Sequence, residues 1–324
     1  MWCGGGATLL ALVIGLGIAS WQYARERQAR EDAEAARAEA ARLLQQSKAR
    51  ESVSLAAMFL AEGKTEEADA LLVKTPLNSI EPSLEAARVF RSLGDWNAVR
   101  QRWRQAADCY VLFLQANRLE KSAMPQGDQF ALITIGPALA HAGYASEYER
   151  FCHEAITRYS SITDPVDATM LLKSCLLMPA SESVLERLQP VSDNLTTILG
   201  TPNHRHAVDP FQGSFTALSL AMHAYRSGDF AGALEWNRKC LASPDTNQVR
   251  IATAHVVSAM AAQRLNQPEQ AKEELSQARV IFDTPFEEGV TYPRGAGNGL
   301  WQDWAIARVL EREATGIVEG RGGR

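Results

Sequence analysis

Apolar residues recur every three or four positions along most of the chain beyond residue 50, and this period predicts amphipathic helices. Turns break the pattern near Gly63, Gln101, Gly143, Gly228 and Asn266, and each turn is followed by a second helical stretch that contains alanine. Alternating patterns typical of strands are scarce. We therefore expect an all-α protein built from successive antiparallel helix hairpins.

Small residues lie where the two helices of a hairpin must approach each other closely. One hairpin has Gly94 and Ala106 at these places, and another has Ala221 and Ala233. This spacing is that of the tetratricopeptide repeat, whose units of ~34 residues must stack to bury their apolar faces. The prediction is a right-handed α-α superhelix, a tetratricopeptide-like solenoid, over residues 51–318.

The long interval between Gly143 and Gly228 predicts one further, degenerate hairpin. Its helices are expected near residues 166–178 and 182–199. Pro190 removes an amide donor from the second helix and should interrupt and kink it. The array then holds about six hairpins.

The end of the array is predicted to be a capping helix near residues 300–310. Trp301 and Trp304 are three positions apart and so share one face, which we interpret as core rather than a ligand platform. A loop is expected over residues 200–213, and a disordered tail over residues 319–324.

The N-terminal segment resembles a membrane anchor. Residues 7–20 carry no charge, and Trp2 and Trp21 flank them at a distance of ~30 Å in a helix, which matches the hydrocarbon thickness of a bilayer. We expect a transmembrane anchor at residues 1–23, with a cleaved signal peptide as the alternative. The Ala-, Arg- and Glu-rich residues 24–50 predict a charged helical stalk.

The orientation of this anchor is open. Arg25, Arg27 and Arg30 follow the apolar run, and the positive-inside rule would place the repeats in the cytoplasm. Within the run, Gly15 and Ala19 form a small-x-x-x-small pattern that could mediate association between anchors. A structural, self-associating membrane protein is therefore one alternative function.

Composition adds little to this picture but removes one class of partner. The formal net charge is −5, from 33 basic and 38 acidic residues, so no basic footprint for nucleic acid is expected. The five cysteines include no C-x-x-C pair. We interpret four of them as buried structural thiols rather than as disulfides or a zinc site: Cys109, Cys152, Cys175 and Cys240.

Signatures of catalysis are weak in the sequence. The glycine-rich loop, H-R-D-x-x-x-x-N segment and D-F-G motif of protein kinases do not occur. His204, His206 and Asp209 form an H-x-H pattern with a nearby carboxylate, but this is a thin case for a metal site. We expect no enzymatic activity, no cofactor and no small-molecule substrate.

Several stretches resemble a bacterial family, the tetratricopeptide region that follows the membrane span of receptor-like Ser/Thr protein kinases. They are residues 87–110, 136–159, 172–179, 224–241 and 301–314. The resemblance implies a single-pass membrane protein and a role in signalling. In that family the kinase faces cytosolic ATP, so the repeats would lie outside, which opposes the charge-based orientation. The chain would be either an anchored scaffold or the non-catalytic tail of a kinase.

The concave side of such an array is lined by the first helix of each hairpin, and a protein or peptide partner is expected there. The arginines on this side favour an acidic segment or a C-terminal carboxylate. The residues predicted to bind it are Arg88, Arg91, Phe130, Ile133, His141, Phe215, Met222, Tyr225, Arg226, Met260, Gln263 and Arg264. Met222 and Met260 could instead belong to the core. Glutamate at positions 226 and 264 is expected to abolish partner capture without lowering thermal stability.

Overall fold

All regular structure in the described part of the chain is helical. The computed structural model describes residues 5–76, 79–80, 82–119, 130–159, 162–283 and 301–320, without the side chains of residues 5–15, 17–19, 84, 85, 119 and 130. No strand occurs within these ranges, which confirms the all-α class. The chain divides into two compact units, Met1–Glu81 and Pro82–Arg324. This boundary lies about one hairpin later than the expected limit between stalk and array.

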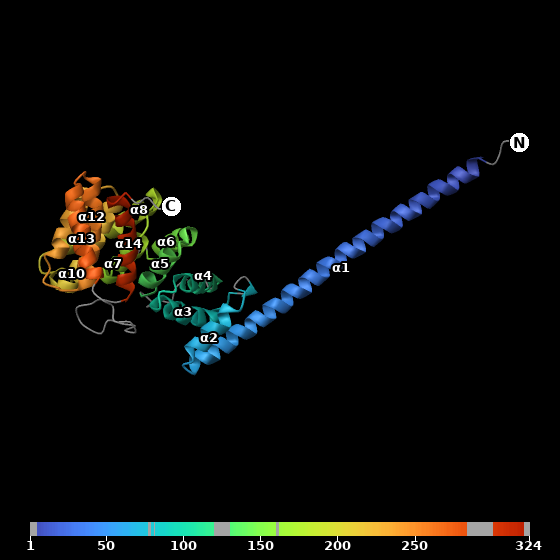
Figure 1. Cartoon of the computed structure of the whole chain (residues 1–324), viewed down its shortest axis with the longest axis horizontal. Coiled ribbons are helices and arrows are strands. Elements are labelled where there is room, and N and C mark those ends of the chain that lie inside the picture. The colour runs from blue at the N-terminus through green and yellow to red at the C-terminus, as the bar shows by residue number, and fades with distance from the viewer. Residues whose placement is uncertain are drawn as a thin grey trace. The chain divides into compact units, whose positions relative to one another are not determined.

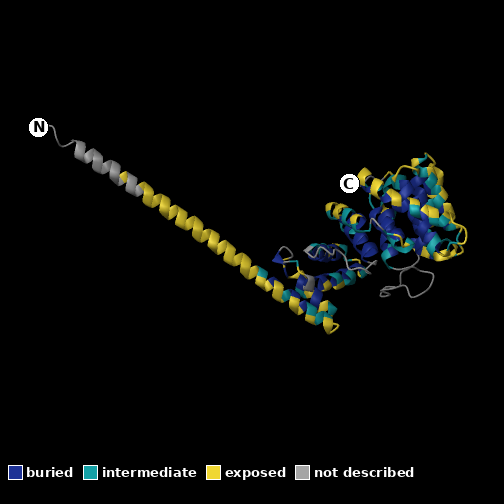
Figure 2. Cartoon of the chain, turned by 180° about the vertical axis from the view of Figure 1, so that it is seen from behind, coloured by how far each residue is buried: buried dark blue, intermediate teal, exposed yellow. Residues whose placement is uncertain are grey.

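The first unit consists of α1 (Gly5–Ala61) and α2 (Thr65–Val73), which pack against each other. Helix α1 has 57 residues, so it contains the predicted stalk and the first helix of the first hairpin without a break (Figure 1). Residues 20–45 are exposed at every position (Figure 2). Burial begins only at Ala49, Val53 and Ala56, where α2 folds back.

The expected membrane anchor lies mostly outside the described side chains. Residues 1–4 are not described, and neither is the burial of Gly15 and Ala19. Among the described residues, no helix combines the length and the apolar character needed to cross a bilayer.

In its described residues the second unit contains five helix hairpins, which correspond to the later hairpins expected from the sequence. Three of them turn over three residues: α3 (Leu84–Val99) with α4 (Trp103–Leu119), α10 (Pro210–Arg226) with α11 (Phe230–Leu241), and α12 (Gln248–Arg264) with α13 (Pro268–Phe282). The other two are α5 (Phe130–Ala142) with α6 (Ala145–Arg158), and α7 (Pro165–Cys175) with α8 (Glu182–Gly200). A short helix, α9 (Arg205–Val208), precedes α10, and α14 (Trp301–Val318) is the last described helix.

All five expected turns lie at the predicted residues and share one geometry. Gly63, Gln101, Gly143, Gly228 and Asn266 have φ values between 57° and 83°, in the left-handed region. At each turn this residue donates its amide to the carbonyl three positions back, and the next residue donates to the carbonyl five positions back, at 2.8–3.3 Å. This Schellman motif satisfies the last carbonyls of the first helix and reverses the chain.

Close packing within a hairpin depends on the small residues, as expected. A Cβ added to Gly94 in α3 would lie 2.6 Å from Cε1 of the Tyr110 ring in α4, too close for any real contact. Tyr110 is fully buried, and its hydroxyl donates to Asp95 Oδ1 at 2.6 Å. Gly94 is therefore the position that lets the aromatic ring lie flat against the neighbouring helix.

From α5 onward the first helices of successive hairpins form a continuous row, and the preceding hairpin meets α5 through its second helix, α4. Helix α5 contacts α7, α7 contacts α10, and α10 contacts α12. We call these four helices the first-helix row. Figure 1 shows α14 beside this row, and its backbone packs most closely against α5, α12 and α13. The expected role as a cap on the last hairpin is therefore incomplete, because α14 also joins α5.

Three local expectations are wrong. Helix α8 is uninterrupted at Pro190, which lies on the exposed face where water can satisfy the carbonyl that loses its donor. The expected loop at residues 200–213 contains α9 and the start of α10, which begins at Pro210 because Asp209 accepts hydrogen bonds from the amides of residues 211 and 212. Glu319, placed in a disordered tail, pairs with Arg279 at 2.5 Å, whereas residues 321–324 lie outside the described range.

Candidate functional site

The strongest candidate site is the face of the first-helix row that α14 covers. Six apolar residues of α14 are buried in this contact and in the packing against α13: Ala305, Ile306, Ala307, Val309, Leu310 and Ala314. Trp304 packs at the edge of the α13 residue Phe282, with ring centroids 5.9 Å apart, and remains half-buried like Trp301. The helix is thus held on several sides by elements distant in sequence.

Near the start of α14, a buried ion pair joins it to α7. Lys173 Nζ lies 2.6 Å from Asp303 Oδ1, and the two side chains are 7% and 11% exposed. The same ammonium group lies 4.5 Å from the centroid of the Phe215 ring in α10. The cation is therefore held between a carboxylate and an aromatic face. These two groups compensate for the hydration that the ammonium group loses on burial.

Further along α14, a second ion pair joins it to α10, between a buried arginine side chain and a carboxylate that is 23% exposed. Arg226 donates from both terminal nitrogens to the Glu313 carboxylate, at 2.5 and 2.6 Å. Its remaining donors bond to the carbonyl oxygens of Leu176 and Leu177, at 3.0 and 2.9 Å. The Arg226 side chain is 5% exposed. This fork is the bidentate geometry that distinguishes arginine from a point charge.

Between the two ion pairs, His141 of α5 contacts α14 through both ring nitrogens. Nε2 lies 2.9 Å from the carbonyl oxygen of Ala305, and Nδ1 lies 2.8 Å from a guanidinium nitrogen of Arg312. This pattern requires a neutral ring with the proton on Nε2, because Nδ1 must accept from arginine. The ring also stacks on Trp103, with centroids 4.1 Å apart and 10° between planes.

The pKa of His141 is lowered to about 4, chiefly because the ring is buried. Hydrogen bonding to Ala305 acts in the opposite direction, and the nearby positive charge of Arg312 lowers the pKa further. The imidazole is therefore neutral at physiological pH. It contacts α14 by a hydrogen bond to a backbone carbonyl rather than as a charged group.

The residues predicted to line an open surface have mixed positions. The side chains of Ile133, Phe215, Met222, Tyr225 and Met260 are buried, so the core interpretation holds for both methionines. Arg91, His141 and Gln263 are half-buried, and only Arg88 and Arg264 are exposed. Arg226 is half-buried as a whole residue, but its side chain is only 5% exposed. The side chain of Phe130 lies outside the described residues.

The expectation of an unoccupied surface is wrong at His141 and Arg226, because α14 lies against both. The proposed test at position 226 is wrong for the same reason. Glutamate there would place a second carboxylate beside Glu313 in a buried site, and the protein would lose stability as well as binding. Arg264 remains a suitable test position, since it is exposed.

The structure does bring together two of the arginines predicted to bind a partner, Arg226 and Arg264. Burial raises the pKa of Tyr225, and the Glu313 carboxylate raises it further. A hydrogen bond with Arg264 and the charge of Arg226 act in the opposite direction. Tyr225, Arg226, Arg264 and Glu313 therefore form one cluster, and its carboxylate comes from the chain itself.

The sequence reading missed Lys173, Trp103, Asp303 and Glu313. A usable signal lies in α14, where Asp303, Ile306, Leu310 and Glu313 share a face, so two carboxylates end an apolar stripe. Carboxylates on a core-facing stripe require buried cations opposite. The identity of those cations has no comparable local signal.

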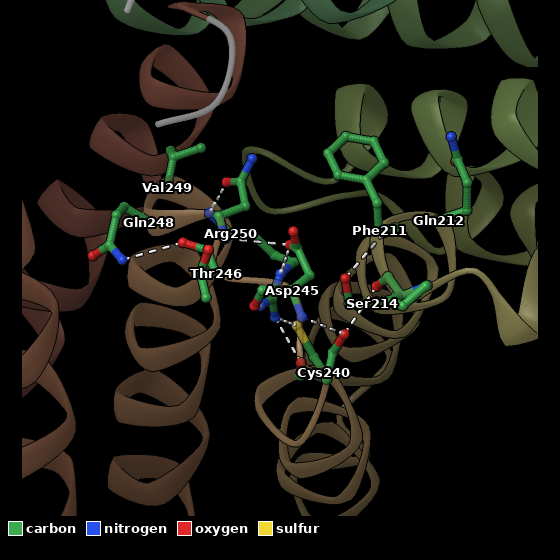
Figure 3. Close-up of polar contacts among 12 residues, drawn as sticks. Phe211, Gln212, Ser214, Cys240, Asp245, Thr246, Gln248, Val249 and Arg250 are labelled. Atoms are coloured by element: carbon green, nitrogen blue, oxygen red, sulfur yellow. Dashed lines mark hydrogen bonds and ion pairs between the residues drawn. The ribbon is translucent and has the colours of Figure 1, made fainter. Parts of the chain in front are cut away.

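A second polar cluster, around Arg250, serves the fold. Arg250 is fully buried and donates to Asp245 Oδ2 at 3.0 Å and to the carbonyl of Cys240 at 2.6 Å (Figure 3). It also donates to the Cys240 sulfur at 3.1 Å and to the Asp245 carbonyl at 2.6 Å. These bonds fix the segment between α11 and α12 against the end of α11.

The cysteines follow the structural interpretation, since Cys109, Cys152, Cys175 and Cys240 are buried and form no disulfide. Burial raises the pKa of the Cys240 thiol despite the opposing charge of Arg250. A buried thiol with a raised pKa is a poor nucleophile.

The H-x-H segment is used in local packing. His204 accepts from the His206 amide and caps α9, and His206 Nε2 lies 2.8 Å from the Thr216 hydroxyl. Asp209 caps α10. Among the described residues, no group of three or more potential metal ligands comes together.

Comparison with known proteins gives no family. No protein-family model matches the chain. No curated protein shows significant similarity to it. The resemblance to the repeat region of receptor-like kinases stays a prediction from the quoted segments.

Proposed function

We propose that this chain is a membrane-anchored scaffold of tetratricopeptide-like hairpins that binds an acidic protein segment on its first-helix row. The support for the repeat class is the shared geometry of the five turns and the contacts of α5, α7, α10 and α12 in chain order. Arrays of this kind present one helix of each hairpin along a common face. The proposal includes the right-handed superhelix.

The observation that carries the binding proposal is the pair of buried cations in that row. Lys173 and Arg226 each hold a carboxylate, and Arg226 does so with two parallel hydrogen bonds. Charge-assisted bonds of this type fix orientation as well as affinity. A partner with suitably placed acidic residues would find the same donors.

Photo-crosslinking tests the binding proposal in the intact protein. A crosslinking residue replaces Arg264, which is exposed beside the cluster, or Lys272, which is exposed on the outer helix α13. Membranes from the native host are irradiated, and the adducts are identified by mass spectrometry. We expect acidic helical segments at position 264 and not at position 272. The same adducts at both positions would contradict partner binding on the row.

Membrane attachment is the second part of the proposal, and it rests on the uncharged run at residues 7–20. Arginine at Val13 and Ile14 would cost ~2.5–3.5 kcal/mol each at the centre of a spanning helix. We expect this double variant to move from the carbonate-washed membrane pellet to the supernatant. Arginine at Ala35 and Ala36, on the exposed stalk, is the matched control and should leave the protein in the pellet.

A further inference from the structure

Helix α14 has the features of a bound ligand rather than only those of a final repeat. Its contact stripe runs Asp303, Ile306, Leu310 and Glu313, with spacings of three, four and three residues. Ile306 and Leu310 are 2% and 1% exposed. The carboxylates at the two ends are ten positions apart, which is ~15 Å along a helix.

The first-helix row contacts both ends of this stripe through ion pairs. Lys173 and Arg226 are 7% and 5% exposed, and each contacts one of the two carboxylates. Leaving either cation buried without its partner would be strongly unfavourable. An occupant of this face must therefore present two acids at this spacing around an apolar centre.

In the middle of the face, His141 contacts the backbone of α14. His141 Nε2 donates to the carbonyl oxygen of Ala305, a group that any helix could present at that turn. The residues that hold α14 lie 87, 130 and 164 positions away in the sequence. In the sequence, 18 residues separate α13 from α14.

We propose that α14 is an internal ligand that occupies the partner site, and that the partner is an acidic amphipathic helix that displaces it. This inference deepens the proposed function and rests on it. The partner class is a helix with two carboxylates ten residues apart, flanking two large apolar residues. As a tethered competitor, α14 acts at an effective concentration on the order of millimolar, so it sets a threshold for any external helix.

The first experiment uses the full chain and a fluorescent peptide of residues 301–318. Wild type is compared with the Asp303→Asn/Glu313→Gln double variant, whose own α14 lacks both charges. We expect the peptide to bind the variant at least tenfold more tightly, as measured by anisotropy. A peptide that carries the same two substitutions is the matched control and should bind at least tenfold more weakly than the acidic peptide. Equal affinity for wild type and variant, or for acidic and neutral peptides, would overturn the proposal.

The second experiment needs no variant and so does not depend on the folding of one. Hydrogen exchange of the wild-type chain is followed with and without millimolar acidic peptide. We expect α14 amides to lose protection while α10–α13 keep theirs. Unchanged protection in α14 at saturating peptide would show that α14 is a permanent part of the core and would overturn the inference.

The outcomes separate the inference from the proposed function. Peptide exchange together with specific crosslinks at position 264 supports both. Specific crosslinks without exchange overturn only the internal ligand. Exchange without crosslinks overturns only the external partner. If sedimentation shows that wild type dimerises and that the peptide dissociates the dimer, the occupant is α14 of a second copy, and the external partner is again overturned.

Discussion

Acidification is expected to weaken the contact between α5 and α14 through His141. The neutral ring accepts a hydrogen bond from Arg312 on Nδ1 and donates to Ala305 from Nε2. A proton on Nδ1 would remove the acceptor and place a positive charge 2.8 Å from a guanidinium nitrogen. Trp103, stacked on one face, leaves the ring little freedom to turn away.

The sign and size follow from the pKa values of the folded and unfolded states. The pKa is about 4 in the folded protein and 6.5 ordinarily, so between these values the unfolded chain binds a proton that the folded chain does not. The contribution is fully present above pH 6.5 and is lost as the pH falls from 6.5 to about 4. At ~1.4 kcal/mol per pH unit, the loss amounts to about 3 kcal/mol. Residual solvent contact of the half-buried ring would reduce it to about 2 kcal/mol.

Urea unfolding from pH 7.5 to 4 measures this loss as the difference between wild type and His141→Gln. Burial also lowers the pKa of His206 and His223, so the subtraction is needed to isolate His141. The matched control is His206→Gln, which removes a histidine that does not contact α14. We expect the wild-type free energy of unfolding to fall about 2–3 kcal/mol more than that of His141→Gln over this range. Parallel curves, or an NMR titration of His141 near pH 6.5, would refute the reasoning.

The remaining predictions concern stability and are measured by urea or thermal unfolding. Gly94→Ala should destabilise the protein by roughly 1–3 kcal/mol, because the new methyl group meets the Tyr110 ring, and a silent substitution would mean that the ring moves freely. Gly143→Ala should cost about 1 kcal/mol although its Cβ meets no atom within 4 Å, because the residue has a positive φ. Gln101→Gly, at the equivalent turn position, should be neutral or slightly stabilising. If both substitutions destabilised the protein, backbone strain would not be the cause. Arg250→Met should cost roughly 3–5 kcal/mol by removing the guanidinium from the Asp245 carboxylate and from the carbonyls of Cys240 and Asp245, and a loss below 1 kcal/mol would show that water replaces the guanidinium.

Local signals account for the parts of the fold that the sequence predicted correctly. A Schellman turn involves only six consecutive residues, so Gly63, Gly143 and Gly228 mark their turns directly. Gln101 and Asn266 were located by the apolar period instead, and they adopt the same left-handed conformation despite their side chains. The Asp209-Pro210 pair is typical of a helix start and indicates α10, although this segment was expected to be a loop.

The candidate site could be predicted only in part, because its ion pairs join segments far apart in the chain. The sequence predicted that Arg226 would bind a carboxylate of a partner, whereas the carboxylate beside it belongs to Glu313 of the same chain, and nothing near position 226 points to Glu313. Periodicity predicted α14 as an amphipathic helix. An amphipathic helix can pack on any apolar face, so this property does not specify which helices it contacts. The pairing of Lys173 with Asp303 depends on how four helices stack, which the residue pattern does not encode locally.

Helix α14 also changes how the hairpins depend on one another. In an array of repeats, each hairpin is stabilised by its neighbours, and the stability is close to a sum of adjacent contacts. Helix α14 contacts α5 as well as α12 and α13, so it couples hairpins that are not neighbours in the row. Its displacement would remove the links between the first and last members and leave only nearest-neighbour contacts. Binding of an external helix at the same face would restore those links, because it would meet the same cations and the same histidine. Occupancy of this face and cooperative unfolding of the array should therefore rise and fall together.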